Sequence, residues 1–545
     1  MKAVNLRLGL GTFLLLLFPL VLADLAGAEV PALGSFLDSG PLGQPRRHGH
    51  GHRHHKPFLH HEGLESLREA KRNAAVLAPS VTASPHVLLG STVVGGFDGI
   101  DESASLAIPP DGAIAVSATY IVEAVNDNLS IWTKTYGPNG ELSAVTPIVA
   151  AADLNFFFGN NPNCFTPAND FFGLISDPSL DYDAVKDRFI LSMTSFEQLL
   201  FTSSLCVAVS ATGNPAGTWF IYAFPISPFF SLLDFPRAVI GADGLFYVAG
   251  NLFVCCDAAG NPVFSRARVY AFKSTDMYAG RNTTPRVANV GRDPQSGLPA
   301  DSLTPARAVG VSGMYFLSAS NGASGGSMIS LWRWKSPFGS NTFVRQGSVQ
   351  VSPYVQPPAA LQLGGFPTGV TACSQTGANC IETNDARNLA AYWSTNTVWG
   401  THAIGCTQAG TPVACVQWYQ LGNLNGRPTL LQHGIVDDGN PGHYRYFPSL
   451  AVDQAGNVAL AYNFSSASDY PGIRYTPISS GAQGSEAVLK AGEVTLQEPR
   501  YGDYAATALD PHDRLTIWHV GEYAKLLAGT FSEWGTWLSA IKIGP

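Results

Sequence analysis

From about residue 86 onward, short apolar runs alternate with clusters of Gly, Pro, Asn and Asp. Long stretches with the three- and four-residue apolar spacing of an amphipathic helix do not occur in this region. Short apolar runs that end at turn-forming residues are typical of β-strands joined by tight turns. The pattern therefore predicts an all-β region built from many short strands.

A weak internal repeat runs through the same region. Each copy has a strand of small and apolar residues, a turn, and a second strand rich in aromatic or β-branched residues, as in "RAVIGADGLFYVAGNLF". Successive turns lie about 56 to about 82 residues apart, a period that indicates a repeat architecture. The seven units have their turns near Asp111, Asp187, Asp243, Ser312, Ser394, Ala455 and Asp513.

Strand-turn-strand units at this spacing favour a β-propeller, in which each blade has four strands. A β-sandwich would place only about 8–12 residues between all of its strands. We therefore expect residues 86–545 to form a propeller of seven blades, or of six, because the unit near Ser394 is the least regular. The first strand of each blade would line the central channel, so the loop before it would face one mouth.

The first 28 residues have the pattern of a signal peptide. Lys2 and Arg7 precede the apolar run 12–22, and Ala26-Gly27-Ala28 is a small-x-small cleavage site. The apolar run is too short for a membrane span, and no later stretch approaches 18 apolar residues. We expect a protein that is secreted, periplasmic or held at the cell surface, with no membrane span in its mature form.

Residues 29–85 differ from the rest and are expected to be a mostly disordered leader with a short helix over 64–77. The leader is rich in histidine, and such tracts bind Zn²⁺, Cu²⁺ or Ni²⁺ through neutral imidazole. The alternative is a solvated tail with incidental metal affinity. The histidines concerned are His48, His50, His52, His54, His55, His60 and His61.

Eight cysteines fit an oxidising compartment. Two pairs are local, Cys373 with Cys380 and Cys406 with Cys415, and both are expected to close hairpin loops. Cys164 and Cys206 lie on either side of one strand region and could pair. The adjacent Cys255 and Cys256 either form a vicinal disulfide or each bridge elsewhere, since sequence does not decide connectivity.

Arginine recurs just before the first strand of several units. If the units are propeller blades, these guanidinium groups should converge on one mouth of the channel and bind an anionic ligand, because arginine suits carboxylate and phosphate. In the alternative interpretation, Asp234, Asp385 and Asp503 clasp the neighbouring arginines as ion pairs. The arginines are Arg237, Arg307, Arg387, Arg445 and Arg500.

Groups for catalysis are fewer. Glycoside hydrolysis needs two positioned carboxyl groups, or a Tyr with an acid partner. The segment "GASGGS" at 322–327 is expected to be a turn, since no helix follows it, and no H-E-x-x-H motif occurs. The loop "DDGNPGH" at 437–443 has oxygen ligands that suit structural Ca²⁺, but it lacks the EF-hand spacing. The candidate catalytic residues are Asp385, Glu498, Tyr501, Asp503 and Glu522.

Several segments resemble a group of secreted bacterial sialidase-like β-propeller proteins. They include "DPSLDYDAVKDRFILSM", "YFPSLAVDQAGNVALAYNFSS" and "RYGDYAATALDPHDRLTIWHVGEYA", and the resemblance covers most of residues 100–545. It implies a propeller and export. Sialidases also carry an arginine triad for the sialate carboxylate, a Tyr/Glu pair, an Asp acid and a repeated Asp box, S-x-D-x-G-x-T-W. No intact Asp box occurs in this sequence.

Three functions follow as hypotheses. The first is a non-catalytic propeller that binds an anionic glycan or a protein surface at its channel mouth. The second is a glycoside hydrolase or lyase of sialidase-like type that acts on acidic sugars, and the third is metal capture by the His-rich leader. Nucleic acid is not an expected partner, because the net charge is −8 and no basic face is evident. Oligomeric state is not indicated.

Overall fold

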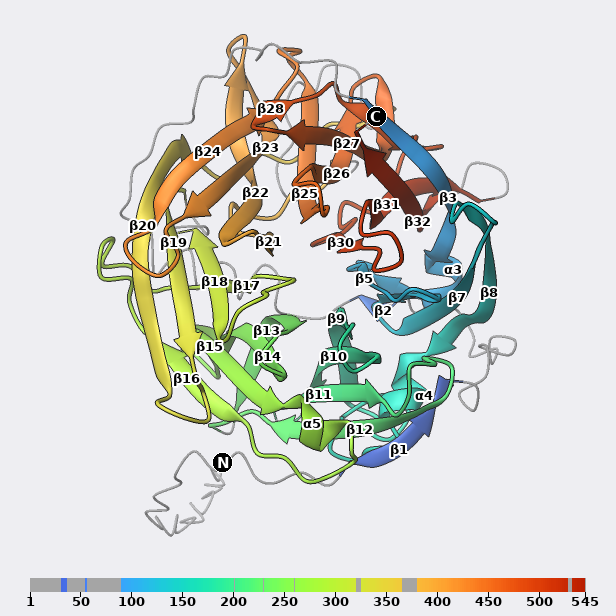
Figure 1. The fold of residues 1–545 in the computed structure, drawn as a ribbon, viewed down its shortest axis with the longest axis vertical. Coiled ribbons are helices and arrows are strands. Elements are labelled where there is room, and N and C mark those ends of the chain that lie inside the picture. Colours follow the sequence, from blue (N-terminus) through green and yellow to red (C-terminus); the bar gives the residue numbers. More distant parts are fainter. Residues whose placement is uncertain are drawn as a thin grey trace, which may run out of the picture.

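A computed structural model describes residues 31–36, 54–55 and 90–544, except 200, 229, 259, 320–324, 365–379 and 528–531. Within these residues the strands form seven antiparallel sheets arranged around a central axis (Figure 1). This is the seven-bladed β-propeller that the repeat predicts, so the six-bladed alternative is wrong. The signal peptide, most of the leader and its expected helix lie outside the described residues.

In blades one to six the innermost strand comes first in the chain. Blade one comprises β5 (Ala113–Val116), β6 (Tyr120–Val125), β7 (Asn128–Tyr136) and β8 (Leu142–Asp153). Blade two comprises β9 (Gly173–Asp183), β10 (Arg188–Glu197), β11 (Thr202–Ser210) and β12 (Thr218–Pro225). Blade three comprises β13 (Ser231–Ile240), β14 (Leu245–Val254), β15 (Val263–Lys273) and β16 (Arg286–Val290).

Blades four to six follow the same order. Blade four comprises β17 (Thr304–Pro305), β18 (Met314–Ala319), β19 (Gly326–Lys335) and β20 (Thr342–Tyr354). Blade five comprises β21 (Ala390–Ser394), β22 (Thr397–Gln408), β23 (Thr411–Gly422) and β24 (Thr429–Val436). Blade six comprises β25 (His443–Val452), β26 (Val458–Ser466), β27 (Asp469–Ser479), β28 (Ala482–Gln483) and β29 (Ala487–Lys490).

Blade seven closes the ring with strands from both ends of the described region. It comprises β30 (Ala506–Leu509), β31 (Thr516–Leu526), β32 (Ser532–Ile543) and, as its outer strand, β3 (Ser91–Asp101). Ser91 pairs with Ile543 and Phe97 with Leu538, and Figure 1 shows the blue β3 beside the dark red β32. Backbone hydrogen bonds between residues far apart in the chain therefore hold the ring shut.

Short elements complete the fold. The helices α3 (Glu102–Ser105), α4 (Leu154–Phe158) and α5 (Ser274–Met277) each form about one turn. The two-residue strand β2 (His54–His55) pairs in parallel with β4 (Ala107–Ile108). The strand β1 (Ala32–Ser35) adds a fifth strand to blade two by pairing with β12. Part of the segment expected to be a disordered leader is therefore joined to the propeller.

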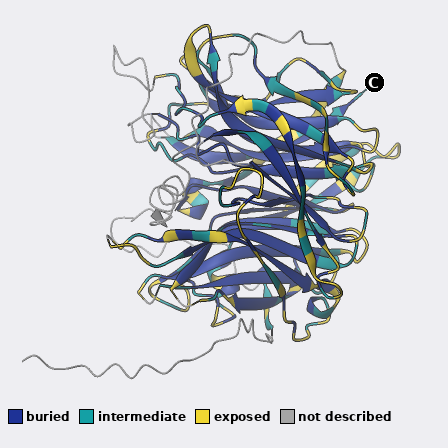
Figure 2. Ribbon diagram, turned by 90° about the vertical axis from the view of Figure 1, so that its left-hand side faces the viewer, coloured by how far each residue is buried: buried dark blue, intermediate teal, exposed yellow. Residues whose placement is uncertain are grey.

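Large aromatic side chains fill the core of the propeller. Trp219, Trp334, Trp418 and Trp518 are among the largest fully buried side chains. Each indole N–H donates a hydrogen bond, for example from Trp219 to the Pro215 carbonyl at 2.8 Å, so burial leaves no polar group unpaired. Figure 2 shows the same division across the molecule, with buried residues along the strands and exposed residues mainly in the loops.

Six of the seven expected turns join the first and second strands of their blades. The exception is Asp111, which precedes β5, whereas the turn after β5 lies at residues 117–119. This turn lacks Gly and Pro, and the Ser117 hydroxyl organises it by accepting the N–H groups of Thr119 at 3.2 Å and Tyr120 at 2.9 Å. A serine-based turn of this kind has a weaker sequence signature than "PPDG".

Three disulfides connect described residues: Cys164–Cys206, the vicinal Cys255–Cys256, and Cys406–Cys415. The first two were left open by the sequence, and the third is the local pair that it predicts. Cys380 is also disulfide-bonded, but its expected partner Cys373 lies outside the described residues.

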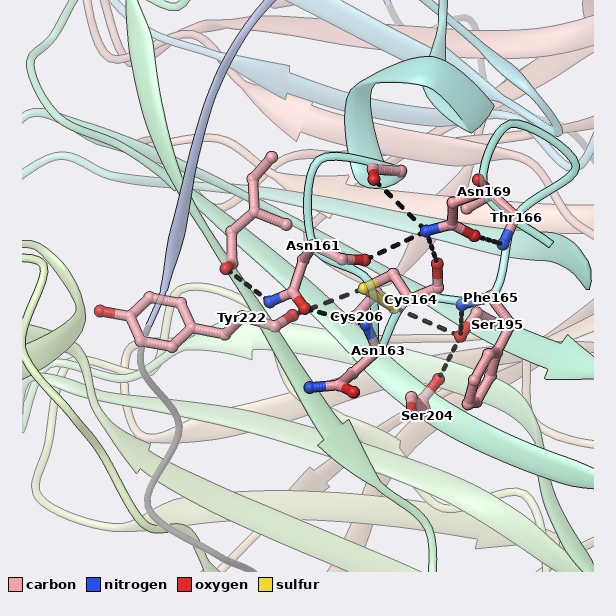
Figure 3. The surroundings of a disulfide bond; sticks show 12 residues. Asn161, Asn163, Cys164, Phe165, Thr166, Asn169, Ser195, Ser204, Cys206 and Tyr222 are labelled. Atoms are coloured by element: carbon pink, nitrogen blue, oxygen red, sulfur yellow. Dashed lines mark hydrogen bonds between the residues drawn. A yellow bond between two sulfur atoms is a disulfide. The ribbon is translucent and has the colours of Figure 1, made fainter.

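The Cys164–Cys206 disulfide anchors the long loop 159–172 to blade two (Figure 3). On the same loop, Asn161 donates from Nδ2 to the Ile221 carbonyl at 3.0 Å. Asn169 ties the loop to itself by donating to the Cys164 carbonyl at 2.9 Å. The loop is therefore fixed against β12 at one end and braced internally.

Candidate channel-mouth site

A recurring kink shapes the start of the inner strands. Asp177, Phe235 and Phe447 have left-handed φ values of 61°, 55° and 50°, and each is followed by a proline. The strand pairing shifts at each of these points, as in a β-bulge. Non-glycine residues in this conformation are strained, and here they redirect side chains at one mouth of the channel, which we call the upper mouth.

Six side chains gather at the upper mouth, and we call them the channel-mouth cluster. They come from the loops before β5 and β30, from the inner strands β9 and β13, and from β31. Electrostatic contacts connect each of them with others of the group. The members are Asp111, Asp177, Arg237, Asp503, Tyr504 and Glu522.

Glu522 is a fully buried carboxyl group of the cluster. It is 0% exposed, and the Gly112 N–H lies 3.5 Å from its Oε1, while Oε2 has no hydrogen-bond partner. Burial raises the pKa of Glu522 well above its usual value, and the carboxylates of Asp111 and Asp503 raise it further. Burial and charge repulsion thus both favour the protonated form of this carboxyl group.

Glycine allows the loop before β30 to approach this carboxyl group. A Cβ at Gly502 would lie 3.2 Å from Cδ of Glu522, which is closer than most carbon contacts. The absence of a side chain at this position therefore lets the loop that carries Asp503 lie against Glu522.

Asp503 has polar partners on both carboxylate oxygens. Its Oδ2 lies 3.1 Å from Nη2 of Arg500, and its Oδ1 accepts from Asn384 Nδ2 at 3.4 Å. The cluster thus places a buried carboxyl group with a raised pKa within electrostatic range of a carboxyl group in an ion pair. Two carboxyl groups in such different environments are the arrangement that acid–base chemistry needs.

Arg237 forms the positive part of the cluster. Its guanidinium carbon lies 4.3 Å from the Tyr504 ring centroid and 5.4 Å from that of Phe235, and its Nη2 donates to the Leu389 carbonyl at 3.3 Å. Among the described residues it forms no ion pair, and burial lowers its pKa. Arg237 is a cation held by aromatic rings rather than by a carboxylate.

Tyr504 completes the arrangement above Arg237. The side chain is 1% exposed, yet its hydroxyl has no hydrogen-bond partner. Burial raises the pKa of Tyr504, and Asp177 and Asp111 raise it further. Its hydroxyl is therefore an uncharged polar group.

Arg387 and Asp385 form a buried bidentate ion pair beside the cluster. The Nε–Oδ1 and Nη2–Oδ2 distances are 2.7 and 2.8 Å, and Asp234 and Asp503 add to the electrostatic stabilisation of Arg387. Two of the three expected clasps, Asp385–Arg387 and Asp503–Arg500, are confirmed. The expected Asp234–Arg237 clasp is wrong, because the bulge at Phe235 turns Arg237 onto Tyr504 instead.

The other two arginines of the series lie away from the cluster. Arg445 is buried within blade six, where Glu486 and Asp438 bind it at 2.7 and 3.1 Å. Arg307 reaches the opposite, lower mouth and donates to the Leu180 carbonyl at 2.6 Å. The five guanidinium groups therefore do not converge, because the loops before the inner strands differ in length and in bulges.

The remaining catalytic candidates have structural contacts. Tyr501 is buried and donates from its hydroxyl to the backbone carbonyl of Glu522 at 2.5 Å, so it holds β31 in place. Glu498 is half-buried, and its Oε1 accepts from the Arg500 N–H at 3.5 Å. Neither side chain is a member of the cluster.

Sequence reasoning missed Asp111, Asp177 and Tyr504. Asp111 and Tyr504 lie in the loops just before the inner strands β5 and β30, and Asp177 lies at the bulge of the inner strand β9. These positions are close to those of the arginines that the sequence comparison considered. Comparing all polar residues at this position across the repeats, rather than arginine alone, would have found them.

A small cavity of about 30 Å³ lies in the channel beside Arg237. Small hydroxyl side chains line it together with Arg237, and the Ser449 and Thr507 hydroxyls lie 2.9 Å apart.

The channel-mouth cluster contains no residue of the two segments that the sequence indicates for metal binding, the 437–443 loop and the His-rich leader. Asp438 of the 437–443 loop binds Arg445 at 3.1 Å and His443 at 2.7 Å, so those partners occupy it. No group of three or more His, Cys, Asp or Glu side chains in the described part of the chain is placed to hold a metal. Metal capture by the leader stays a prediction, since the side chains of the His tract lie outside the described residues.

No helix in the described residues is long and apolar enough to cross a membrane. No family model and no curated protein sequence matches the chain. Membership of the sialidase-like group is thus an expectation from resemblance alone.

Solved structures with a similar fold include several propellers. A protein of unknown function from Dyadobacter fermentans is 14% identical, with a TM-score of 0.37 over 67% of this chain and 94% of that one. The GH93 α-L-arabinofuranosidase of Fusarium graminearum is 10% identical, with a TM-score of 0.35 over 79% and 92%. A subtype N10 neuraminidase-like protein of A/little yellow-shouldered bat/Guatemala/060/2010 is 12% identical, with a TM-score of 0.30 over 69% and 96%. Similarity at this level concerns the fold and carries no argument about substrate.

Proposed function

We propose that the protein is a carbohydrate-active β-propeller that cleaves glycosidic bonds at its upper mouth. The observation that carries the proposal is Glu522, a buried carboxyl group with a raised pKa and one oxygen without a partner, within electrostatic range of Asp503, which pairs with Arg500. Glycosidases use such a pair, in which one carboxyl group protonates the leaving oxygen and the other acts as base or nucleophile. Glu522 would be the acid and Asp503 the second carboxylate.

Charge explains why hydrolysis fits better than simple capture of an anion. The cluster holds four carboxyl groups and one guanidinium, and Arg387 and Arg500 beside it are already paired with Asp385 and Asp503. A strongly anionic ligand would meet repulsion from these carboxylates. A neutral sugar, or a sugar with a single carboxylate aimed at Arg237, meets no such barrier.

Binding without catalysis is the second candidate, and Arg237 favours it. This guanidinium has no carboxylate partner among the described residues and is partly exposed. It could bind a carboxylate or sulfate group of an acidic glycan or of a protein surface. Arg237→Ala should then abolish binding on a glycan array, whereas unchanged binding would exclude the arginine as an anion site.

We also propose that the protein works outside the cytoplasm. Three disulfides join described residues, and such bonds persist mainly in oxidising compartments. Fractionation of the host cells with an antibody to the propeller would test this localisation.

A panel of neutral and acidic fluorogenic glycosides tests the enzymatic proposal. We expect the wild-type protein to hydrolyse at least one of them and Asp503→Asn to lose at least about 100-fold in kcat/KM. Asp276→Asn is the matched control, because it removes a carboxylate from an exposed ion pair with Arg281 and should keep full activity. No turnover by the wild type on the panel and on acidic polysaccharides would reject the proposal.

A further inference from the structure

A second polar pocket lies outside the channel-mouth cluster, at the outer edge of blades one and two. Its cavity has a volume of about 270 Å³ and is bounded by the β6–β7 turn, the start of α4, the loop anchored by Cys164–Cys206 and the first residues of β9. Four of its lining side chains carry oxygen acceptors from one region of blade one. They are Asp127, Asn128, Asp153 and Asn155.

The backbone brings these four residues together. Asn128 and Asp153 are cross-strand partners in the β7–β8 ladder, and the Asp127 carbonyl accepts the Leu154 N–H at 2.8 Å. One oxygen of Asp153 accepts the N–H groups of Asn155 and Phe156 at 2.8 and 3.2 Å. The arrangement is therefore held by the sheet and by the cap of α4, and does not depend on a ligand to form.

The unpaired side-chain oxygen of Asn128 favours a cation in the pocket. It is 1% exposed, its Nδ2 donates to the Ala151 carbonyl at 2.8 Å, and the residue lines the cavity, which leaves its Oδ1 as the end without a donor. That oxygen has no hydrogen-bond partner, and neither has the buried Oδ1 of Asn155. A buried acceptor without a donor is costly, and here two of them lie beside two carboxyl groups.

No basic side chain balances these oxygens. None of the residues that line the pocket is Lys, Arg or His, and Asp127 and Asp153 form no ion pair within the described residues. Asp127 and Asp153 lie within electrostatic range of one another. The two carboxyl groups therefore repel one another in the structure as it stands.

We propose that this pocket binds a calcium ion through Asp127, Asn128, Asp153 and Asn155. Carboxylate and amide oxygens are the hard ligands that Ca²⁺ takes, and Ca²⁺ tolerates the irregular geometry of a turn and a helix start. Mg²⁺ would need stricter octahedral ligation and usually keeps several waters. The proposal is independent of hydrolysis at the upper mouth.

The position of the pocket suggests what the ion does. Asn126, the residue before Asp127, donates to Asp111 Oδ2 at 2.9 Å and accepts the Asp177 N–H at 2.9 Å. A calcium ion that fixes the β6–β7 turn would thereby also fix two carboxyl groups of the channel-mouth cluster. The ion would be structural, with an indirect influence on the upper mouth.

Thermal unfolding and calorimetry of the full chain after EDTA treatment test the site, with CaCl₂ and MgCl₂ as probes. We expect 1 mM Ca²⁺ to raise the Tm of the wild type by about 2 °C or more, as expected for a ligand that binds only the folded state, and Mg²⁺ to raise it less. Asp127→Asn should abolish the calcium shift. Without calcium, it should be at least as stable as wild type, because repulsion with Asp153 is removed.

The control is Asp170→Asn, which changes a carboxylate on the same disulfide-anchored loop that does not line the pocket. It should keep the calcium shift. If Asp127→Asn does not fold, Asn155→Ala replaces it, and loss of the shift is again expected. Absence of a calcium shift in the wild type, a shift that survives Asp127→Asn, or an equal response to Mg²⁺ would overturn the proposal.

Discussion

Glu123 and Glu522 occupy corresponding strands of neighbouring blades but have different surroundings. Both lie on the second strand of their blade and are 0% exposed, and burial raises the pKa of both. Glu123 has every oxygen in use, since Oε2 accepts the Ile100 N–H at 3.2 Å and Oε1 bonds to the Thr536 hydroxyl. Glu522 keeps Oε2 without a partner beside other carboxyl groups.

The difference shows that a raised pKa alone does not define a site. Desolvation produces the shift at both positions, but only Glu522 has a free oxygen near a paired carboxylate and a cation. Glu123 instead joins blade one to β3 and β32 of blade seven. Three predictions test this division.

The largest effect is expected on catalysis. Glu522→Gln removes the proposed acid and should lower kcat/KM about 10²- to 10⁴-fold, the usual contribution of a general acid. Glu123→Gln removes an equally buried acid and should leave activity within about twofold. The two variants would be compared on the best glycoside of the panel, and equal losses would mean that Glu522 has no special role.

A smaller effect concerns the dependence of stability on pH. Because the pKa of Glu123 is raised from 4.5 to about 8, the native state binds more protons than the unfolded state between these values. Stability should therefore fall as the pH rises through this window, by at most about 1.4 kcal/mol per pH unit from this group.

Glu123→Gln should remove this part of the slope. Urea unfolding at several pH values between 5 and 8.5 measures it. An unchanged slope in the variant would show that Glu123 does not titrate in this range.

The smallest effect is expected from Thr536→Val. This change removes the hydroxyl that bonds to Glu123 Oε1 and to the Ile100 carbonyl at 2.9 Å while nearly keeping the side-chain volume. The free energy of unfolding should fall by about 1–3 kcal/mol, the cost of a buried acceptor left unpaired. Activity should not change, and a loss of activity would connect the Glu123 pocket with the upper mouth.

Sequence repeats were enough to predict the propeller, its seven units and most of its turns, because the alternation of small and aromatic strands is repeated in every blade. They did not predict β1, since the four residues of "ALGS" carry no signal for pairing with β12, about 190 positions away. Positions at the upper mouth depend on bulges at Asp177 and Phe235, which sequence patterns do not specify.

The site was therefore predicted in part. Glu522, Asp503 and Arg237 were candidates, but nothing in their spacing selected them over Tyr501 or Arg445. Their selection required knowing which side chains share a neighbourhood and which already have partners.

The closure of blade seven has a consequence for biosynthesis. β3 is synthesised before the other strands of the ring and β32 after them, so the two strands can pair only once β32 has left the ribosome. Until then the earlier blades can form local hairpins, but the ring has an open edge that invites pairing with other chains. Closure of the propeller thus waits for its last strand, and the open ring is the stage at which the chain most needs protection from aggregation.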